Sequence, residues 1–78
     1  MTEREIFGHC LGKHIRLRRI EIGWSQEKLE EMADLSVTMI GKIERGERIP
    51  ESLTLFKIAE AMGISLDRLQ VDVMECMK

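Results

Sequence analysis

Residues 24–46, WSQEKLEEMADLSVTMIGKIERG, decide the fold of this chain. Apolar residues recur at helical spacing on both sides of the short segment DLS, and each of the two patterns begins at a serine. Each serine stands directly after a large apolar residue and four positions before another one, in the triplets Trp24, Ser25, Leu29 and Leu35, Ser36, Ile40. A serine N-cap accepts a hydrogen bond from the first turn, while the apolar pair clamps the entering chain. The pattern therefore predicts helices over about 25–33 and 36–45.

The connection between these two predicted helices is only DLS, residues 34–36. A connection this short makes two helices cross steeply, as in a helix-turn-helix unit. The same serine pattern recurs at Ser65. A glycine also follows each of three apolar runs, and a glycine in the left-handed conformation can end a helix. These glycines are Gly23, Gly46 and Gly63.

The rest of the chain also shows helical spacing of apolar residues and lacks the alternation of a strand. Further helices are predicted over about 6–22, 52–62 and 65–76, and the segment GERIPES, residues 46–52, is the one substantial loop. The expected fold class is all-α, a compact five-helix bundle that forms a single domain over residues 1–78.

The composition, with 44% hydrophobic and 33% charged residues, is that of a globular domain. There is no run of 18 apolar residues, and the N-terminus MTEREIFGHC is too charged for a signal peptide. We therefore expect a cytoplasmic protein with no membrane partner. Cys10 and Cys76 lie at opposite ends of the chain, so they are expected to be free thiols.

Metal binding and catalysis find little support in the sequence. Cys10 and His14 share a helix face beside His9, but zinc needs four ligands and no second cluster exists unless Cys76 arrives from the far end. No orienting acid accompanies a Cys–His pair either. We expect no enzyme activity, no metal, no cofactor and no small-molecule ligand.

The formal net charge of −2 opposes binding to nucleic acid, but the distribution of charge is uneven. The segment KHIRLRR, residues 13–19, contains no acid, whereas residues 51–78 contain five acids. This distribution predicts a polarised molecule that is basic toward one end.

The predicted helix over 36–45 has one apolar side and one unusual side. Ile40 and Ile43 are expected to point inward, and the opposite side collects Val37, Thr38, Gly41, Lys42 and Arg45. A solvated helix face more often carries Glu, Lys and Gln, which are strong helix formers. The small residues here indicate a surface shaped for contact.

Three motifs point to one family: R-x-x-x-G-x-S-Q-E-x-L over 19–29, I-x-x-I-E-R-G over 40–46, and L-x-K-I-A-x-A-x-G-I-S-L-D-x-L over 55–69. With them, residues 11–69 resemble the lambda repressor-like helix-turn-helix family, also called XRE or Cro-type. The resemblance implies that the helix over 36–45 enters the major groove of DNA and that the helix over 25–33 lies across it.

The resemblance also implies roles for individual residues. The expected base-facing residues are Ser36, Val37, Thr38 and Lys42, and the expected contacts to the DNA backbone come from Gln26, Arg45 and Arg48. At Gly41, the missing side chain is expected to let the helix backbone approach DNA. Arg19 and Glu44 match a structural ion pair of the family, which orients the reading helix.

The predicted last helix has more apolar residues than one domain needs, namely Val71, Val73, Met74 and Met77. Surplus apolar surface on a small protein indicates a homodimer. The expected function is therefore a transcriptional regulator that binds a palindromic operator as a homodimer, similar to restriction–modification controllers or phage-type repressors. The alternative is an antitoxin that binds both operator DNA and a toxin protein.

Overall fold

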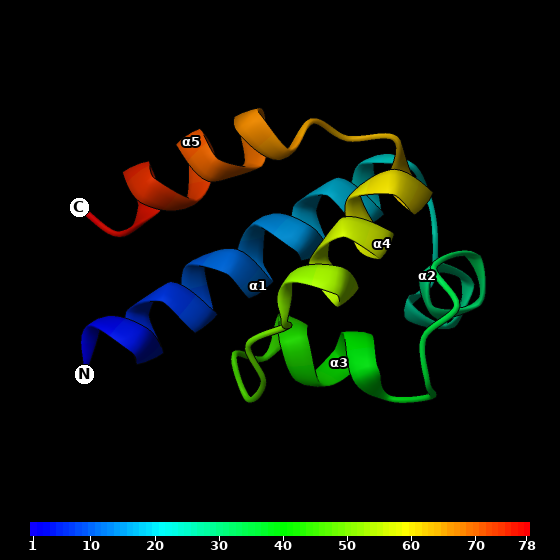
Figure 1. Ribbon diagram of the computed structural model, residues 1–78, viewed down its shortest axis with the longest axis horizontal. Helices are drawn as coiled ribbons and strands as arrows, with labels where there is room; N and C mark the ends of the chain where they lie inside the picture. The colour runs from blue at the N-terminus through cyan, green and yellow to red at the C-terminus, as the bar shows by residue number, and fades with distance from the viewer.

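Five helices joined by short turns make up the computed structural model, which describes residues 1–78 (Figure 1). They are α1 (Glu3–Glu21), α2 (Gln26–Met32), α3 (Met39–Glu44), α4 (Ser52–Met62) and α5 (Leu66–Cys76). The prediction of an all-α five-helix bundle is confirmed. None of the helices combines the length and the hydropathy needed to span a lipid bilayer.

Two of the three predicted serine caps are present. The hydroxyl of Ser25 accepts a hydrogen bond from the N–H of Lys28 at 3.0 Å, and the hydroxyl of Ser65 accepts one from the N–H of Arg68 at 3.1 Å. Each bond satisfies an orphan donor of the first helical turn. The three predicted helix-closing glycines all have positive φ, at Gly23, Gly46 and Gly63.

Helix α1 begins three residues earlier than the apolar pattern predicts, because a capping box forms at its start. The hydroxyl of Thr2 accepts a hydrogen bond from the N–H of Glu5, and the carboxylate of Glu5 accepts one from the N–H of Thr2. The spacing T-x-x-E is a readable signal for a helix start, so this boundary could have been predicted from the sequence.

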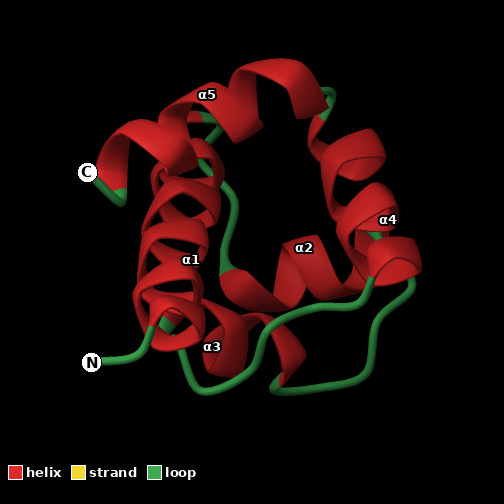
Figure 2. Cartoon of the chain, turned by 60° about the vertical axis from the view of Figure 1, so that its left-hand side comes forward, coloured by secondary structure: helices red, strands yellow, loops and turns green.

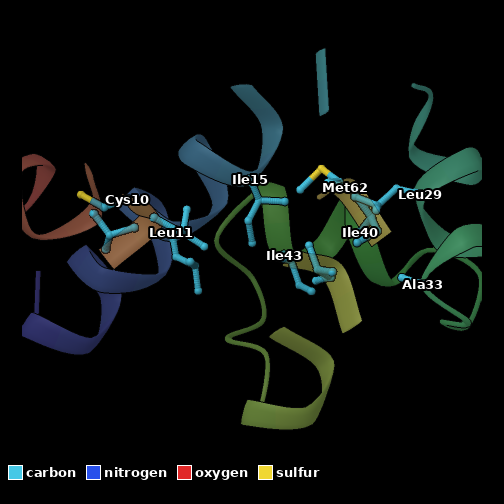
Figure 3. Packing of buried hydrophobic residues seen from close by; sticks show 11 residues of the cluster. Cys10, Leu11, Ile15, Leu29, Ala33, Ile40, Ile43 and Met62 are labelled. Carbon is cyan, nitrogen blue, oxygen red and sulfur yellow. The ribbon is translucent and has the colours of Figure 1, made fainter. Parts of the chain in front are cut away.

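The core is an elongated apolar cluster that joins all five helices (Figure 3). Helix α1 packs against α3 and α5, and α2 packs against α3 and α4 (Figure 2). The largest side chains with almost no exposed surface are Ile15, Leu29, Ile40, Ile43 and Ile58.

Gly12 allows α1 to lie directly on the end of α3. A Cβ atom at this position would come within 2.9 Å of the carbonyl oxygen of Glu44 and closer still to that of Ile43. Both obstacles are backbone atoms, which cannot turn away as a flexible side chain can. The absence of a side chain at Gly12 therefore allows the close contact between α1 and the end of α3.

The prediction of two free thiols is wrong, because Cys10 and Cys76 form a disulfide. Their Cα atoms are 5.7 Å apart, within the usual range for a disulfide. The chain brings them together because α5 folds back toward the N-terminal end of α1, so that both termini lie on one side of the molecule (Figure 1). No local sequence pattern indicates this proximity, because the two cysteines are 66 positions apart.

The expected separation of charge is reduced, because two cations of the basic segment 13–19 pair with acids from other parts of the chain. Arg18 of α1 binds Asp72 of α5 at 2.5 Å, and Asp72 also lies 3.3 Å from Arg68. Arg19 is largely buried and paired with Glu44. The basic segment 13–19 is therefore not one free basic patch, since two of its cations are bound to acids from other parts of the chain.

Candidate nucleic-acid interface

Helix α3 presents one buried side and one exposed side, as predicted. Ile40 and Ile43 are 0% and 1% exposed, respectively, and anchor the helix in the core. Lys42 is exposed on the other side, and Val37 is 79% exposed in the turn that precedes the helix. A rigidly held helix with a free outer side is the geometry that a groove-reading element needs.

The start of α3 differs from the prediction. The helix begins at Met39 and not directly after Ser36, and its N-cap is Thr38, which has φ of 73° and makes no side-chain capping bond. Ser36 contributes its carbonyl oxygen, which accepts the N–H of Met39 at 3.3 Å. A positive φ is unfavourable for a β-branched residue and costs about 1–3 kcal/mol.

The carboxylate of Glu30, in α2, provides the missing cap. Its Oε2 atom accepts a hydrogen bond from the N–H of Ile40 at 3.0 Å, and the residue is only 6% exposed. This acceptor satisfies an orphan donor in the first turn of α3 and competes with the local cap expected from Ser36. No sequence pattern indicates this role, because Glu30 is one of several acids in the segment EKLEEM.

Five of the eight residues predicted to contact DNA gather around one small hollow between α2 and α3. The hollow has a volume of about 160 Å³, and these five residues are Gln26, Val37, Thr38, Gly41 and Arg45. Two acids complete its lining, Glu27 and Glu30. The structure thus places the predicted residues next to one another, together with carboxylates that the prediction did not include.

Gly41 is buried, so the expectation of a backbone open to DNA does not describe the free protein. A Cβ atom at this position would lie 3.1 Å from Nη1 of Arg45 and 3.3 Å from Oε1 of Gln26. Those two side chains cover the glycine. Its role in this structure is to leave room for them.

Arg19 and Glu44 form the ion pair that the family resemblance implies. The Nε and Nη2 atoms of Arg19 donate to the two carboxylate oxygens of Glu44 at 2.7 and 2.9 Å, and Nη1 donates to the carbonyl oxygen of Trp24 at 2.7 Å. The hydrogen bonds to Glu44 raise the pKa of Arg19, so the guanidinium stays charged. The pair ties α1 to the end of α3.

Gln26 joins this network from the start of α2. Its amide nitrogen donates to Oε1 of Glu44 at 3.0 Å. The bond holds the side chain beside Gly41 and links the first residue of α2 to the last residue of α3. The network therefore fixes the two helices of the unit relative to each other.

The cations at the end of α3 differ in their availability. Arg45 donates to Glu47 at 2.6 Å, which raises the pKa of Arg45 and lowers that of Glu47. Arg48 is exposed and forms no ion pair, and the same is true of Lys42. Lys42 and Arg48 are thus two cations in or just after α3 that are not paired with a carboxylate of the chain.

The four predicted dimerisation residues do not share one environment. Val71 and Met74 are 52% and 53% exposed on α5, whereas Val73 is 2% exposed and belongs to the core. Met77 is half-buried and packs against the core. Inclusion of Val73 as surplus apolar surface was wrong, because Val73 is part of the buried core of the domain.

Beside Met74 lies an apolar groove of about 190 Å³ between α1, α4 and α5. Seven of its eight lining residues are apolar, and the lining consists of Phe7, Leu11, Leu55, Leu66, Leu69, Gln70, Val73 and Met74. In Figure 1, α5 lies above α1 and α3 lies below it, and in Figure 2 the two helices lie toward opposite ends of α1. A partner that covers α5 would leave the outer side of α3 free.

Two crossed helices, a short turn and an exposed outer side of the second helix define a helix-turn-helix protein. The family model described as helix-turn-helix matches residues 15–69, and the chain belongs to the helix-turn-helix family of transcriptional regulators.

Three curated relatives are named as HTH-type transcriptional regulators. An uncharacterized HTH-type transcriptional regulator of Bacillus subtilis, YazB, is 36% identical over 58 residues, which cover 74% of this chain and 84% of YazB. Another from Sinorhizobium fredii, y4dJ, is 42% identical over 64% of both chains. The Escherichia coli regulator SutR is 40% identical over 77% of this chain and only 34% of its own length.

Among solved structures, the chain resembles the clp gene regulator ClgR of Corynebacterium glutamicum. The TM-score is 0.85, and the match covers 91% of this chain and 76% of ClgR. At 24% sequence identity, this likeness supports the fold.

Proposed function

We propose that this chain is a sequence-specific DNA-binding regulator of transcription that acts as a homodimer on a palindromic operator. The observation that carries the proposal is the outer side of α3, which is free while Ile40 and Ile43 fix the inner side in the core. Lys42 on that side, and Arg48 in the loop after α3, are exposed and form no ion pair. Free cations beside a rigid exposed helix suit a groove lined with phosphates.

The contacts divide into those that read bases and those that hold the backbone. Lys42 can donate to O6 or N7 of guanine, and Val37 and Thr38 can contact a thymine methyl group and a base edge. Arg48, Arg45 and Gln26 would bind phosphates, which position the protein without reading the sequence. Few side chains here can hydrogen-bond to bases, so DNA shape is expected to add to the specificity.

The size of the domain supports the use of two copies. Its longest extent is 31 Å, whereas two reading helices on one face of the duplex lie about 34 Å apart. One domain can therefore fill only one half-site. We assign the contact between copies to α5, where Val71, Met74 and Leu66 are exposed beside an apolar groove.

Within this class we propose a regulator of the kind that the sequence resembles, a restriction–modification controller or a phage-type repressor. Such regulators respond to their own concentration through dimerisation. Two of the three acids on α5 are paired within the chain, Asp72 with Arg18 and Arg68 and Glu75 with Lys78, which leaves only Asp67 for a separate protein partner.

Selection of bound fragments from random double-stranded DNA, followed by sequencing, tests the proposal. We expect an inverted repeat whose half-site centres are about one helical turn, or a whole number of turns, apart. Recovery of a single unrepeated site would contradict the homodimer, and recovery of unenriched DNA would contradict sequence-specific binding.

A further inference from the structure

The carboxylate of Glu30 caps α3 where the local sequence predicts a different start of the helix, at Ser36. Ser36 follows a large apolar residue and precedes Ile40 by four positions, which is the pattern of a helix start. A helix that began there would direct the N–H of Ile40 to the carbonyl oxygen of Ser36, by the usual bond to the fourth residue back. In the structure that N–H binds the carboxylate of Glu30 instead.

The two acceptors exclude each other, because the N–H of Ile40 points along one direction. With Glu30 as acceptor, the carbonyl oxygen of Ser36 accepts the N–H of Met39, one residue earlier. The chain then turns through Thr38 with a positive φ before the helix begins. The carboxylate is 6% exposed and reaches α3 from a neighbouring helix, so the tertiary structure holds it in place.

The choice of acceptor decides where Val37 and Thr38 point. In the observed arrangement both residues lie in the turn and line the hollow with Glu30 and Gln26. In a helix that began after Ser36, they would occupy its first turn and project from the helix surface at helical spacing. These are two of the residues assigned above to base contacts.

We propose that Glu30 sets the starting residue of the reading helix, and that it thereby determines the base preference conferred by Val37 and Thr38. Glu30 is a positioning residue, since it is buried and acts through the backbone of α3. The effect on base preference rests on the proposed function, whereas the effect on the helix start does not.

The test compares Glu30→Ala with Glu30→Gln, whose side-chain carbonyl oxygen can still accept the N–H of Ile40. Glu31→Ala removes the same charge from the exposed neighbouring position and serves as the control. In the free proteins, backbone carbon chemical shifts report the conformation of residues 37 and 38. We expect helical shifts at both residues in Glu30→Ala and parent-like shifts in the other two variants. Unchanged shifts in Glu30→Ala would overturn the proposal.

Selection from random DNA gives the second readout. Glu30→Ala is expected to prefer different bases at one or two positions of each half-site. On the site preferred by the parent it should bind about tenfold more weakly or worse, the effect of one mismatched base pair. Glu30→Gln and Glu31→Ala should select the parent site. A parent-like site for folded Glu30→Ala would overturn the link to base preference. If the parent itself selects no site, the proposed function fails, and the chemical shifts still decide the helix start.

Thr38→Gly tests the helix start without any change at Glu30. Glycine accepts the observed positive φ without strain, so the thermal midpoint should equal or exceed that of the parent. If α3 began after Ser36, position 38 would lie within the helix, and glycine would lower the midpoint. A lower midpoint would therefore overturn the proposal.

Discussion

The sulfur atoms of Cys10 and Cys76 are bonded, which ties the middle of α1 to the last residue of α5. The bond closes a loop across 66 positions of the sequence and restrains the helix that carries the proposed dimer contact. A chain of this size buries too little surface to be very stable on that account alone, so a covalent link between the two ends has a large relative effect.

Reduction of the disulfide is expected to lower the free energy of unfolding by up to about 4 kcal/mol, the chain-entropy estimate for a loop of this length. Chemical denaturation with and without a dithiol measures the change. The variant Cys10→Ser/Cys76→Ser should have the same free energy of unfolding as the reduced parent, and the dithiol should not change it. Equal stability of the oxidised and reduced parent would show that the bond contributes nothing.

Glu44→Ala is expected to destabilise the protein by about 3–5 kcal/mol, because it leaves the buried guanidinium of Arg19 without its counter-ion. Gln26 would lose its hydrogen bond as well. Glu47→Ala, at an exposed position three residues after Glu44, should leave the stability nearly unchanged. Equal effects of the two variants in urea unfolding would argue against a structural role for the Arg19–Glu44 pair.

Lys42→Ala is expected to cost about 1–3 kcal/mol on the selected operator and to relax the preference at one base pair. Arg48→Ala should instead weaken binding to all sequences alike, since a phosphate contact does not read bases. Lys78→Ala is the control, since it removes a positive charge at the C-terminus, which lies across α1 from α3 (Figure 1). Titrations on operator and random DNA measure the effects, and equal losses on both for Lys42→Ala would remove Lys42 from the base-reading residues.

Glu47→Gln is expected to tighten binding to operator and random DNA by a similar factor. The substitution releases Arg45 from its ion pair and removes a negative charge near the phosphates. The slope of log K against log salt should become steeper by up to about 0.9, the value for one added phosphate contact. A slope that does not change would indicate that Arg45 does not reach the DNA backbone.

Met74→Glu is expected to yield a folded monomer with weak operator binding, because it places a charge at the edge of the apolar groove on α5. Met32→Glu is a matched control, since Met32 is 50% exposed on α2. Sedimentation velocity at several concentrations measures the association. A dimer that persists in Met74→Glu would place the interface elsewhere.

Much of the fold could be predicted from the sequence, because the signals are local. The caps at Ser25 and Ser65 need only the residues of one helical turn, and the inward side of α3 follows from the spacing of Ile40 and Ile43. The capping box at Thr2 is equally local, since its two hydrogen bonds join residues three positions apart, although the apolar pattern alone places the helix start near residue 6.

The candidate site was predictable to a smaller extent. Its members were identified through the family motifs, but their surroundings depend on side chains from other helices. Gly41 is covered by Gln26 from α2 and by Arg45, and Arg45 is itself held by Glu47. No periodicity shows which side chain will fill the space above a glycine.

The sequence by itself determined the five helices, their order and the family, since these follow from spacing, caps and motifs within short segments. The tertiary structure alone decided the pairing of Cys10 with Cys76 and the starting residue of α3. In the second case a local acceptor, Ser36, competes with a distant one, Glu30, for the same N–H group. Only the packing of α2 against α3 brings that carboxylate within 3.0 Å, and this proximity decides the competition.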